Sequence, residues 1–164
     1  GTVFEGYVGD AAFTAGVGEI NELARSLVQT TEGALFAGIA RMVAGNHIGD
    51  VSFAIQKYAE SRGFHVTREY TGHGVGRAMH EGPQVPNYGN EGRGMALRVG
   101  MTVALEPMLL VGSPYTRVLP DQWTVSSADG SLTAHFEHTV AVTENGPLIL
   151  TTQGDGSVLD GIWK

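Results

Sequence analysis

A change of hydrophobic period along the chain is the sequence feature that most constrains its fold. Apolar residues recur at helical spacing over residues 18–43, and again from near Asp50, a residue type suited to a helix N-cap, to Gly63. Beyond that glycine the pattern changes to short apolar segments typical of strands. These segments cover residues 64–70, 101–111, 122–128, 134–143 and 147–151, and a further strand fits residues 2–8.

Two consecutive helices followed by antiparallel strands predict an α+β fold, with the helices covering one face of a curved antiparallel sheet. Glu144, Asn145 and Gly146 predict a hairpin turn between the last two strands. Residues 84–96 predict a polar loop, and residues 154–164 a surface tail. A chain of 164 residues fits a single domain, 1–164, that buries roughly 70% of the surface of its unfolded chain.

The composition excludes several classes of partner and site. Lys and Arg number 10 against 17 Asp and Glu, giving a formal net charge of −7, which argues against nucleic acid or an anionic membrane as partner. The chain has no cysteine, so any metal must be held by histidines and carboxylates, which suit Zn, Mn, Fe or Co. No apolar run approaches the ~20 residues that a membrane span needs.

The amino terminus begins inside a predicted strand. It has no initiator Met and no basic-plus-apolar signal pattern. We therefore expect the chain to be a processed or partial polypeptide.

A glycine-rich segment carries two histidines. Residues 71–83 read TGHGVGRAMHEGP, with His73 among the glycines and His80 before an acid and a proline. Imidazoles bind metals or transfer protons near neutral pH, and neighbouring glycines would let the backbone approach a ligand closely. The segment therefore predicts a chemical site.

Two glutamates lie inside apolar strands, where an unpaired carboxylate is costly unless it binds a cation. Glu106 shares a strand face with Thr102, Ala104 and Met108, which is not a clean solvent-facing pattern, although that face remains the alternative. Glu137 stands between His135 and His138. Lone strand histidines are more often packed or exposed than ligands, so Glu137 is the better candidate.

Asp10 follows Gly9 at the end of the first predicted strand and, taken alone, could be only a turn residue. Together with His73, Glu106 and Glu137, it makes three carboxylates and one imidazole on different strands or strand ends. Antiparallel strands can gather them into one site for a pair of divalent cations about 3.5–4 Å apart, which would activate water for hydrolysis. No phosphate-binding loop and no Gly-x-Ser-x-Gly elbow is present.

Four segments resemble the methionine aminopeptidases, which are dinuclear metallopeptidases of the pita-bread fold. The segments are GHGVGRAMHEGP at 72–83, LEPM at 105–108, FEHT at 136–139 and GYVGD at 6–10, and the resemblance extends from residue 1 to about Thr152. Met108 follows Glu-Pro where the proline peptidases of the same fold usually have glycine. The short interval from His80 to Glu106 is similar to the type I enzymes.

The resemblance implies a role for each matching residue. Asp10 and Glu137 would bridge two divalent ions, and His73 and Glu106 would complete the shell of the first. Glu106 would also take a proton from the attacking water, and His80 would hydrogen-bond the substrate and stabilise the tetrahedral intermediate. Met79 and Trp123 stand where the family lines its methionine pocket, although most members have an aromatic residue at the position of Met79.

The implied function is metal-dependent removal of the amino-terminal methionine from nascent proteins and peptides in the cytoplasm, with preference for a small second residue. The family's further metal-binding aspartate would precede Gly1, so the resemblance implies a carboxyl-terminal portion that binds about one ion and has little activity alone. A companion chain could supply the missing amino-terminal part. The alternatives are an Xaa-Pro peptidase of the same fold and an inactive pita-bread binding module.

Overall fold

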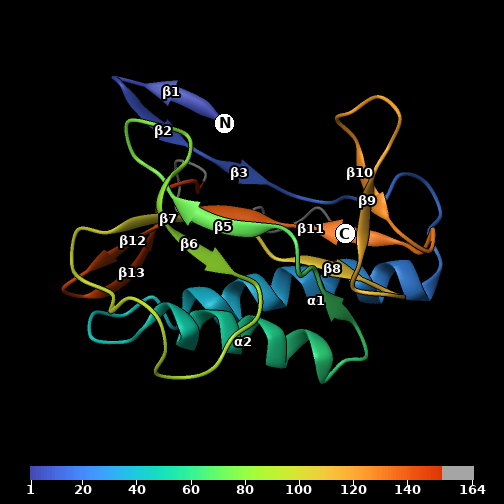
Figure 1. Ribbon diagram of the computed structural model, residues 1–164, viewed down its shortest axis with the longest axis horizontal. Helices are drawn as coiled ribbons and strands as arrows, with labels where there is room; N and C mark the ends of the chain where they lie inside the picture. The colour runs from blue at the N-terminus through green and yellow to red at the C-terminus, as the bar shows by residue number, and fades with distance from the viewer. Residues whose placement is uncertain (153–164) are drawn as a thin grey trace.

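Two helices form a layer against antiparallel strands in the computed structural model, which describes residues 1–152 (Figure 1). Helix α1 spans Glu22–Ile39 and helix α2 spans Ile48–Glu60. Their buried side chains join those of the strands in one hydrophobic cluster, which includes Leu35, Ile55, Leu105 and Val140. The predicted α+β class, with the helices on one face of the sheet, is confirmed.

Helix α1 is shorter than the predicted span of residues 18–43, and helix α2 begins and ends slightly earlier than predicted. Helix α1 starts where the Asn21 side chain accepts a hydrogen bond from Ala24 N at 2.8 Å. Helix α2 has His47, not Asp50, as its N-cap, so that prediction is wrong. Asp50 lies in the first turn, where its carboxylate accepts hydrogen bonds from the N–H groups of His47 and Gly92; these bonds lower its pKa.

A central antiparallel sheet has the strand order β13-β12-β7-β5-β6, and β3 also pairs with β12. Strands β11, β8 and β4 form a three-stranded sheet, and the pairs β1–β2 and β9–β10 form separate hairpins. The bounds of the central sheet are β3 Ala11–Ala12, β5 Thr71–Gly74, β6 Glu81–Pro86, β7 Thr102–Leu105, β12 Glu137–Thr143 and β13 Gly146–Ile149. The others are β1 Thr2–Phe4, β2 Tyr7–Gly9, β4 His65–Val66, β8 Met108–Leu110, β9 Thr116–Val118, β10 Val125–Ser127 and β11 Thr133–His135.

Several predicted strands are shorter or divided. The single strand predicted over residues 2–8 is a hairpin, which turns at Glu5 and Gly6, both with positive φ. The strand predicted over 64–70 covers only β4, and β6 extends into the predicted loop 84–96. Strand β9 has no counterpart in the prediction. The hairpin turn before Gly146 is confirmed, and the predicted surface tail lies outside the described residues.

The strand predicted over 101–111 divides at Glu106 and Pro107, and its partner over 134–143 divides at Phe136. Proline has no N–H group to donate to a ladder, which explains the interruption. The pairing register nevertheless continues through the break, because Leu105 pairs with His138 and Met108 pairs with His135. Phe136 N also donates to Pro107 O at 3.3 Å. Glu106 therefore stands opposite Glu137.

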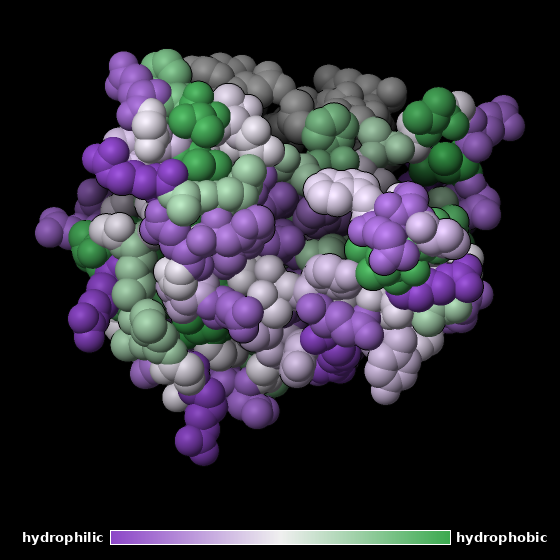
Figure 2. Space-filling model, turned by 45° about the horizontal axis from the view of Figure 1, so that its top comes forward, coloured by the Kyte–Doolittle hydropathy of each residue, from purple (hydrophilic) through white to green (hydrophobic). Residues whose placement is uncertain are grey.

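The face of the sheet away from the helices lies between two projecting hairpins (Figure 1). The β1–β2 hairpin exposes Val3, Phe4 and Tyr7, and the β9–β10 hairpin exposes Val118 and Trp123. Figure 2 shows apolar side chains at both ends of this face and hydrophilic ones in the hollow between them. Neither helix of the described residues is long and apolar enough to cross a membrane.

The helix layer should account for much of the stability. We predict that Leu35→Ala, in which Leu35 is only 1% exposed, lowers the free energy of unfolding by about 2–5 kcal/mol because it leaves a cavity under α1. Leu23→Ala is the matched control on the same helix, since Leu23 is 48% exposed, and should change that free energy by less than about 0.5 kcal/mol. Chemical denaturation followed by circular dichroism measures both, and equal losses would contradict the packing described.

Candidate metal centre

His73 occupies the middle of the sheet on β5, between β6 and β7. Its Nδ1 lies 2.9 Å from Gly74 O, and a carbonyl oxygen can only accept a hydrogen bond. Nδ1 of the neutral ring therefore carries the proton. Nε2 is left with its lone pair directed toward the carboxylates, as a metal ligand requires.

The glycines on either side of His73 are needed by the sheet itself. A Cβ at Gly72 would lie 2.4 Å from Ala104 O, and a Cβ at Gly74 would lie 2.1 Å from Gly82 O. Any larger residue would force β5 away from its neighbouring strands. These two glycines thus serve the close approach of the chain's own backbone, which corrects the interpretation that they admit a ligand.

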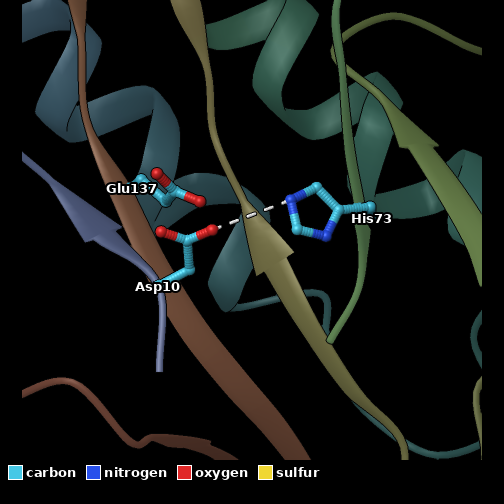
Figure 3. A group of neighbouring side chains, drawn as sticks. All are labelled: Asp10, His73 and Glu137. Atoms are coloured by element: carbon cyan, nitrogen blue, oxygen red, sulfur yellow. Dashed lines mark ion pairs between the residues drawn. The ribbon is translucent and has the colours of Figure 1, made fainter. Parts of the chain in front are cut away.

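Three carboxylates converge on Nε2 of His73 from other elements. Glu106 Oε1 lies 3.4 Å from it, in the break between β7 and β8, and Asp10 Oδ2 lies 3.9 Å from it, between β2 and β3. Glu137 is the first residue of β12, and ligand atoms of Asp10, His73 and Glu137 all lie within 4.8 Å of one another. Figure 3 shows the carboxylates of Asp10 and Glu137 side by side and facing the imidazole of His73. All four residues predicted from the sequence as ligands are brought together.

Burial and mutual repulsion work against ionisation of this cluster. Burial raises the pKa of Glu106 to about 8, with smaller contributions from Glu137 and Asp10. Burial also raises the pKa of Glu137 to about 7, helped by Asp10. The imidazoles of His73 and His135 lie within 4 Å of these carboxylates, and the α-amino group of Gly1 lies 3.4 Å from Asp10 Oδ1.

The donor set fits a divalent cation. Three carboxylates and one imidazole, with no thiolate, suit first-row ions such as Mn, Fe, Co or Zn. A bound cation would replace the missing positive charge and favour the ionised carboxylates, because an opposite charge nearby lowers the pKa of an acid. The raised pKa values of Glu106 and Glu137 are what such a cluster should show without its cation.

The three other predicted site residues occupy different surroundings. The exposed His80 ring lies over that of His73, with centroids 4.3 Å apart and planes tilted by 54°. Met79 is 38% exposed, and its Cε lies beside Gly1. Trp123 belongs to the turn of the β9–β10 hairpin and is 87% exposed, so its indole does not pack against the cluster.

Two residues that the sequence pattern did not favour adjoin the site. The Nε2 atom of His135 is buried without a hydrogen-bond partner, 3.9 Å from Glu137 Oε2, and burial lowers the pKa of His135. Thr139 makes two hydrogen bonds to the backbone of Asp10. Both share a strand face with Glu137, and this alternation is the signal that could have identified them.

A cavity of about 230 Å³ lies beside His135. His135, Met108 and Tyr70 line it, as does Thr67, whose hydroxyl is also buried without a partner. The cavity is therefore mainly apolar with a few polar atoms available to a ligand, as small-molecule sites usually are.

Known proteins share both the sequence and the fold. The methionine aminopeptidase of Clostridium acetobutylicum is 50% identical over 151 residues, which cover 92% of this chain and 60% of the relative. The crystal structure of methionine aminopeptidase from Thermotoga maritima superposes with a TM-score of 0.90 at 50% identity, over 92% of this chain and 61% of that one.

A prolidase from Pyrococcus furiosus, at 23% identity and a TM-score of 0.70, shares the fold over 92% of this chain and 39% of its own. The chain spans about 60% of the length of the curated relatives it matches. Residues 1–144 match the model of metallopeptidase family M24, and the predicted pita-bread fold is confirmed. The chain belongs to metallopeptidase family M24.

Proposed function

We propose that this chain carries the metal centre and part of the substrate site of a methionine aminopeptidase, which hydrolyses the amino-terminal methionine from nascent proteins and peptides in the cytoplasm. The gathering of Asp10, His73, Glu106 and Glu137 around one imidazole nitrogen carries the proposal. The identity of about 50% to relatives named methionine aminopeptidase supports it.

Asp10, His73, Glu106 and Glu137 would hold the metal, with Asp10 and Glu137 as bridging carboxylates where two ions bind. Once bound, divalent ions lower the pKa of water and polarise the scissile carbonyl. We expect this chain to bind about one ion, because its four ligand residues make up one complete site. Manganese, cobalt, iron and zinc all suit the donor set.

Glu106 is the group we assign to proton transfer. The attacking water gives its proton to the Glu106 carboxylate while its oxygen bonds to the scissile carbonyl carbon. The carbon–nitrogen bond then breaks, and Glu106 returns the proton to the leaving amine. Burial raises the pKa of Glu106 and a bound cation would lower it again, so the carboxylate could accept the proton and return it.

We assign His80 to substrate binding rather than to a metal. Its exposed ring stands on the outer side of His73, where an N–H group can donate to the carbonyl oxygen as negative charge develops. Met79 and Trp123 would form apolar walls for the methionine side chain. We propose that the cavity beside His135 receives the second residue of the substrate.

A segment that corresponds to the uncovered part of the relatives would complete the enzyme. It could be an earlier part of the same polypeptide or a companion chain. The two hairpins that flank the site expose apolar side chains, among them Phe4 and Trp123, against which this segment could pack. The intact mass and first residues of the purified protein distinguish the two arrangements.

Metal binding is the most direct test. We predict that the chain binds about one Mn²⁺ or Co²⁺ in a calorimetric titration, and that His73→Ala or Glu137→Gln weakens binding by at least about 100-fold, since even residues behind the ligands are worth 10–100-fold. Glu144→Gln removes an exposed carboxylate at the end of β12 and should leave the affinity unchanged. Two tight sites in the chain would contradict the single-site expectation.

Peptide hydrolysis tests the substrate. We predict that a fusion placing the uncovered part of the Clostridium acetobutylicum relative before residue 1 releases methionine from Met-Ala-Ser, with Co²⁺ or Mn²⁺ added. Glu106→Gln in this fusion should lower kcat by about 100-fold or more, because the proton acceptor is lost. Methionine release is followed by chromatography.

The chain alone serves as a comparison and should show little release. Cleavage of an Xaa-Pro peptide instead would favour the proline peptidase. Cleavage of neither peptide by a folded, metal-loaded fusion would favour a binding module.

The raised carboxylate pKa values predict an unusual pH dependence of stability. Glu106 and Glu137 titrate at about 8 and about 7 in the folded chain, above their ordinary value of 4.5. Between about pH 4.5 and pH 8, the folded state therefore binds more protons than the unfolded state. The free energy of unfolding falls as pH rises through this range. We expect the metal-free melting temperature to drop by on the order of 5 °C from about pH 5.5 to about pH 8.5.

Thermal melts in EDTA and in excess Mn²⁺ measure this effect. Added ion should raise the melting temperature more at the higher pH, because the ligands bind metal when deprotonated. Glu106→Gln should flatten the metal-free profile. A metal-free profile that rises steadily across this range would mean that the cluster is not the crowded set of carboxylates described.

A further inference from the structure

Asp10 joins the exposed β1–β2 hairpin to the short strand β3, which pairs with β12. The β1–β2 hairpin before it exposes most of its side chains, and the strand β3 after it has only two residues. A ligand on so short a connection benefits from another restraint. An aspartate that is free to move would lose conformational entropy when it binds an ion, and this loss would weaken binding. Thr139 supplies such a restraint.

Both hydrogen bonds at this contact use the Thr139 hydroxyl. Asp10 N donates to Thr139 Oγ1 at 2.8 Å, and Thr139 Oγ1 donates to Asp10 O at 2.8 Å. One hydroxyl thus satisfies the donor and the acceptor of a single residue. Thr139 is only 2% exposed, so water is not a ready substitute for the hydroxyl.

The backbone of Thr139 cannot perform this task. On this side of β12 the neighbouring strand changes from β13 to β3: Val140 pairs with Ile149, whereas His138 pairs with Ala11. At the change, Thr139 O accepts from Leu150 N at 2.8 Å, and Thr139 N donates to Thr151 Oγ1 at 3.2 Å. Both backbone groups of Thr139 are occupied, so only its side chain can bind Asp10.

The contact also sets the level of Asp10 in the sheet. Thr139 pairs with Ala104, which pairs in turn with His73 on β5. Residues opposite one another in an antiparallel sheet share a face, and the small Ala104 side chain separates Thr139 from His73. Asp10, held by Thr139, is therefore at the level from which its carboxylate faces His73 across the sheet.

We infer that Thr139 is a positioning residue for the metal centre: its hydroxyl fixes the backbone of Asp10 so that the Asp10 carboxylate is pre-organised to bind the ion. This inference rests on the proposed metal centre and adds to it a residue that touches neither ion nor substrate. Outer residues that orient a ligand typically change metal affinity by 10–100-fold.

Three substitutions at this position separate the hydroxyl from the rest of the side chain. Thr139→Val keeps the shape and removes the hydroxyl, Thr139→Ala removes it without placing a methyl group against Asp10, and Thr139→Ser keeps it. Thr143→Val is the matched control, because Thr143 Oγ1 on the same strand donates to Gly146 O at 2.6 Å, at the far end of β12 from the cluster.

Calorimetric titration of Mn²⁺ into the full chain and its variants is the test, with Co²⁺ absorption as an independent report on the coordination sphere. Thr139→Val and Thr139→Ala should weaken Mn²⁺ binding by about 10–100-fold and alter the Co²⁺ spectrum. Thr139→Ser should stay within about threefold of wild type, as should Thr143→Val. Should Thr139→Val fail to fold, the comparison of Ala with Ser decides.

Two results would overturn the inference alone: wild-type affinity in the Val and Ala variants, or a Ser variant as weak as Ala. Equal weakening in Thr143→Val would also overturn it, because any lost hydroxyl on β12 would then have the same effect. A wild-type chain that binds neither ion would overturn the metal centre itself. Failure of the inference is thereby distinguished from failure of the proposed function.

Discussion

Repulsion among three partly buried carboxylates is the interaction around which this structure is organised. Glu106 and Glu137 stand opposite one another on paired strands, an arrangement that is unfavourable for like charges, and Asp10 adds a third acid. The pKa values of Glu106 and Glu137 rise because the sheet holds both carboxyl groups where solvation is incomplete. The favourable packing of the rest of the fold must outweigh the free-energy cost of gathering these carboxylates. A bound cation would reduce that cost.

The frame that holds the acids together is an antiparallel sheet with its hydrophobic support on one side only. Leu105, Val140 and their neighbours face the helices, and the alternate positions carry Ala104, Glu106, Glu137 and Thr139 on the other face. The break at Pro107 and Phe136 interrupts the ladder without changing the register. The two glutamates therefore stay opposite each other while sitting where regular pairing stops.

The sequence predicts the fold class and the ligand set because both follow from periodicity. Helical spacing, strand alternation and acids in apolar strands are visible residue by residue, and Asp10, His73, Glu106 and Glu137 do converge. Predictions of element boundaries are wrong where a local hydrogen bond or backbone conformation overrides the hydrophobic periodicity. Asp50 bonds back to His47 as a first-turn residue, and Glu5 accepts a positive φ that makes a hairpin of the first strand.

Other features could not be predicted because they depend on distant pairings. The need for glycine at 72 and 74 comes from carbonyl groups of Ala104 and Gly82, and only the assembled sheet brings these close. The importance of Thr139 likewise depends on the meeting of β13 and β3 along one edge of β12. In a sequence, Thr139 is one of many strand threonines.

The four proposed metal ligands differ in how firmly the fold holds them. His73 lies on a strand paired on both sides, Glu137 begins β12, and Glu106 lies between β7 and β8; β7, β8 and β12 all contribute side chains to the hydrophobic cluster. Asp10 lies beside a strand of only two residues, β3, which pairs with β12, and the Thr139 hydroxyl adds two hydrogen bonds to its backbone. Three ligands are thus supported by long or doubly paired elements, and the fourth, Asp10, is supported by a short strand and by the proposed contact with Thr139. Metal affinity should therefore respond more to that hydroxyl than to any comparable change elsewhere on β12.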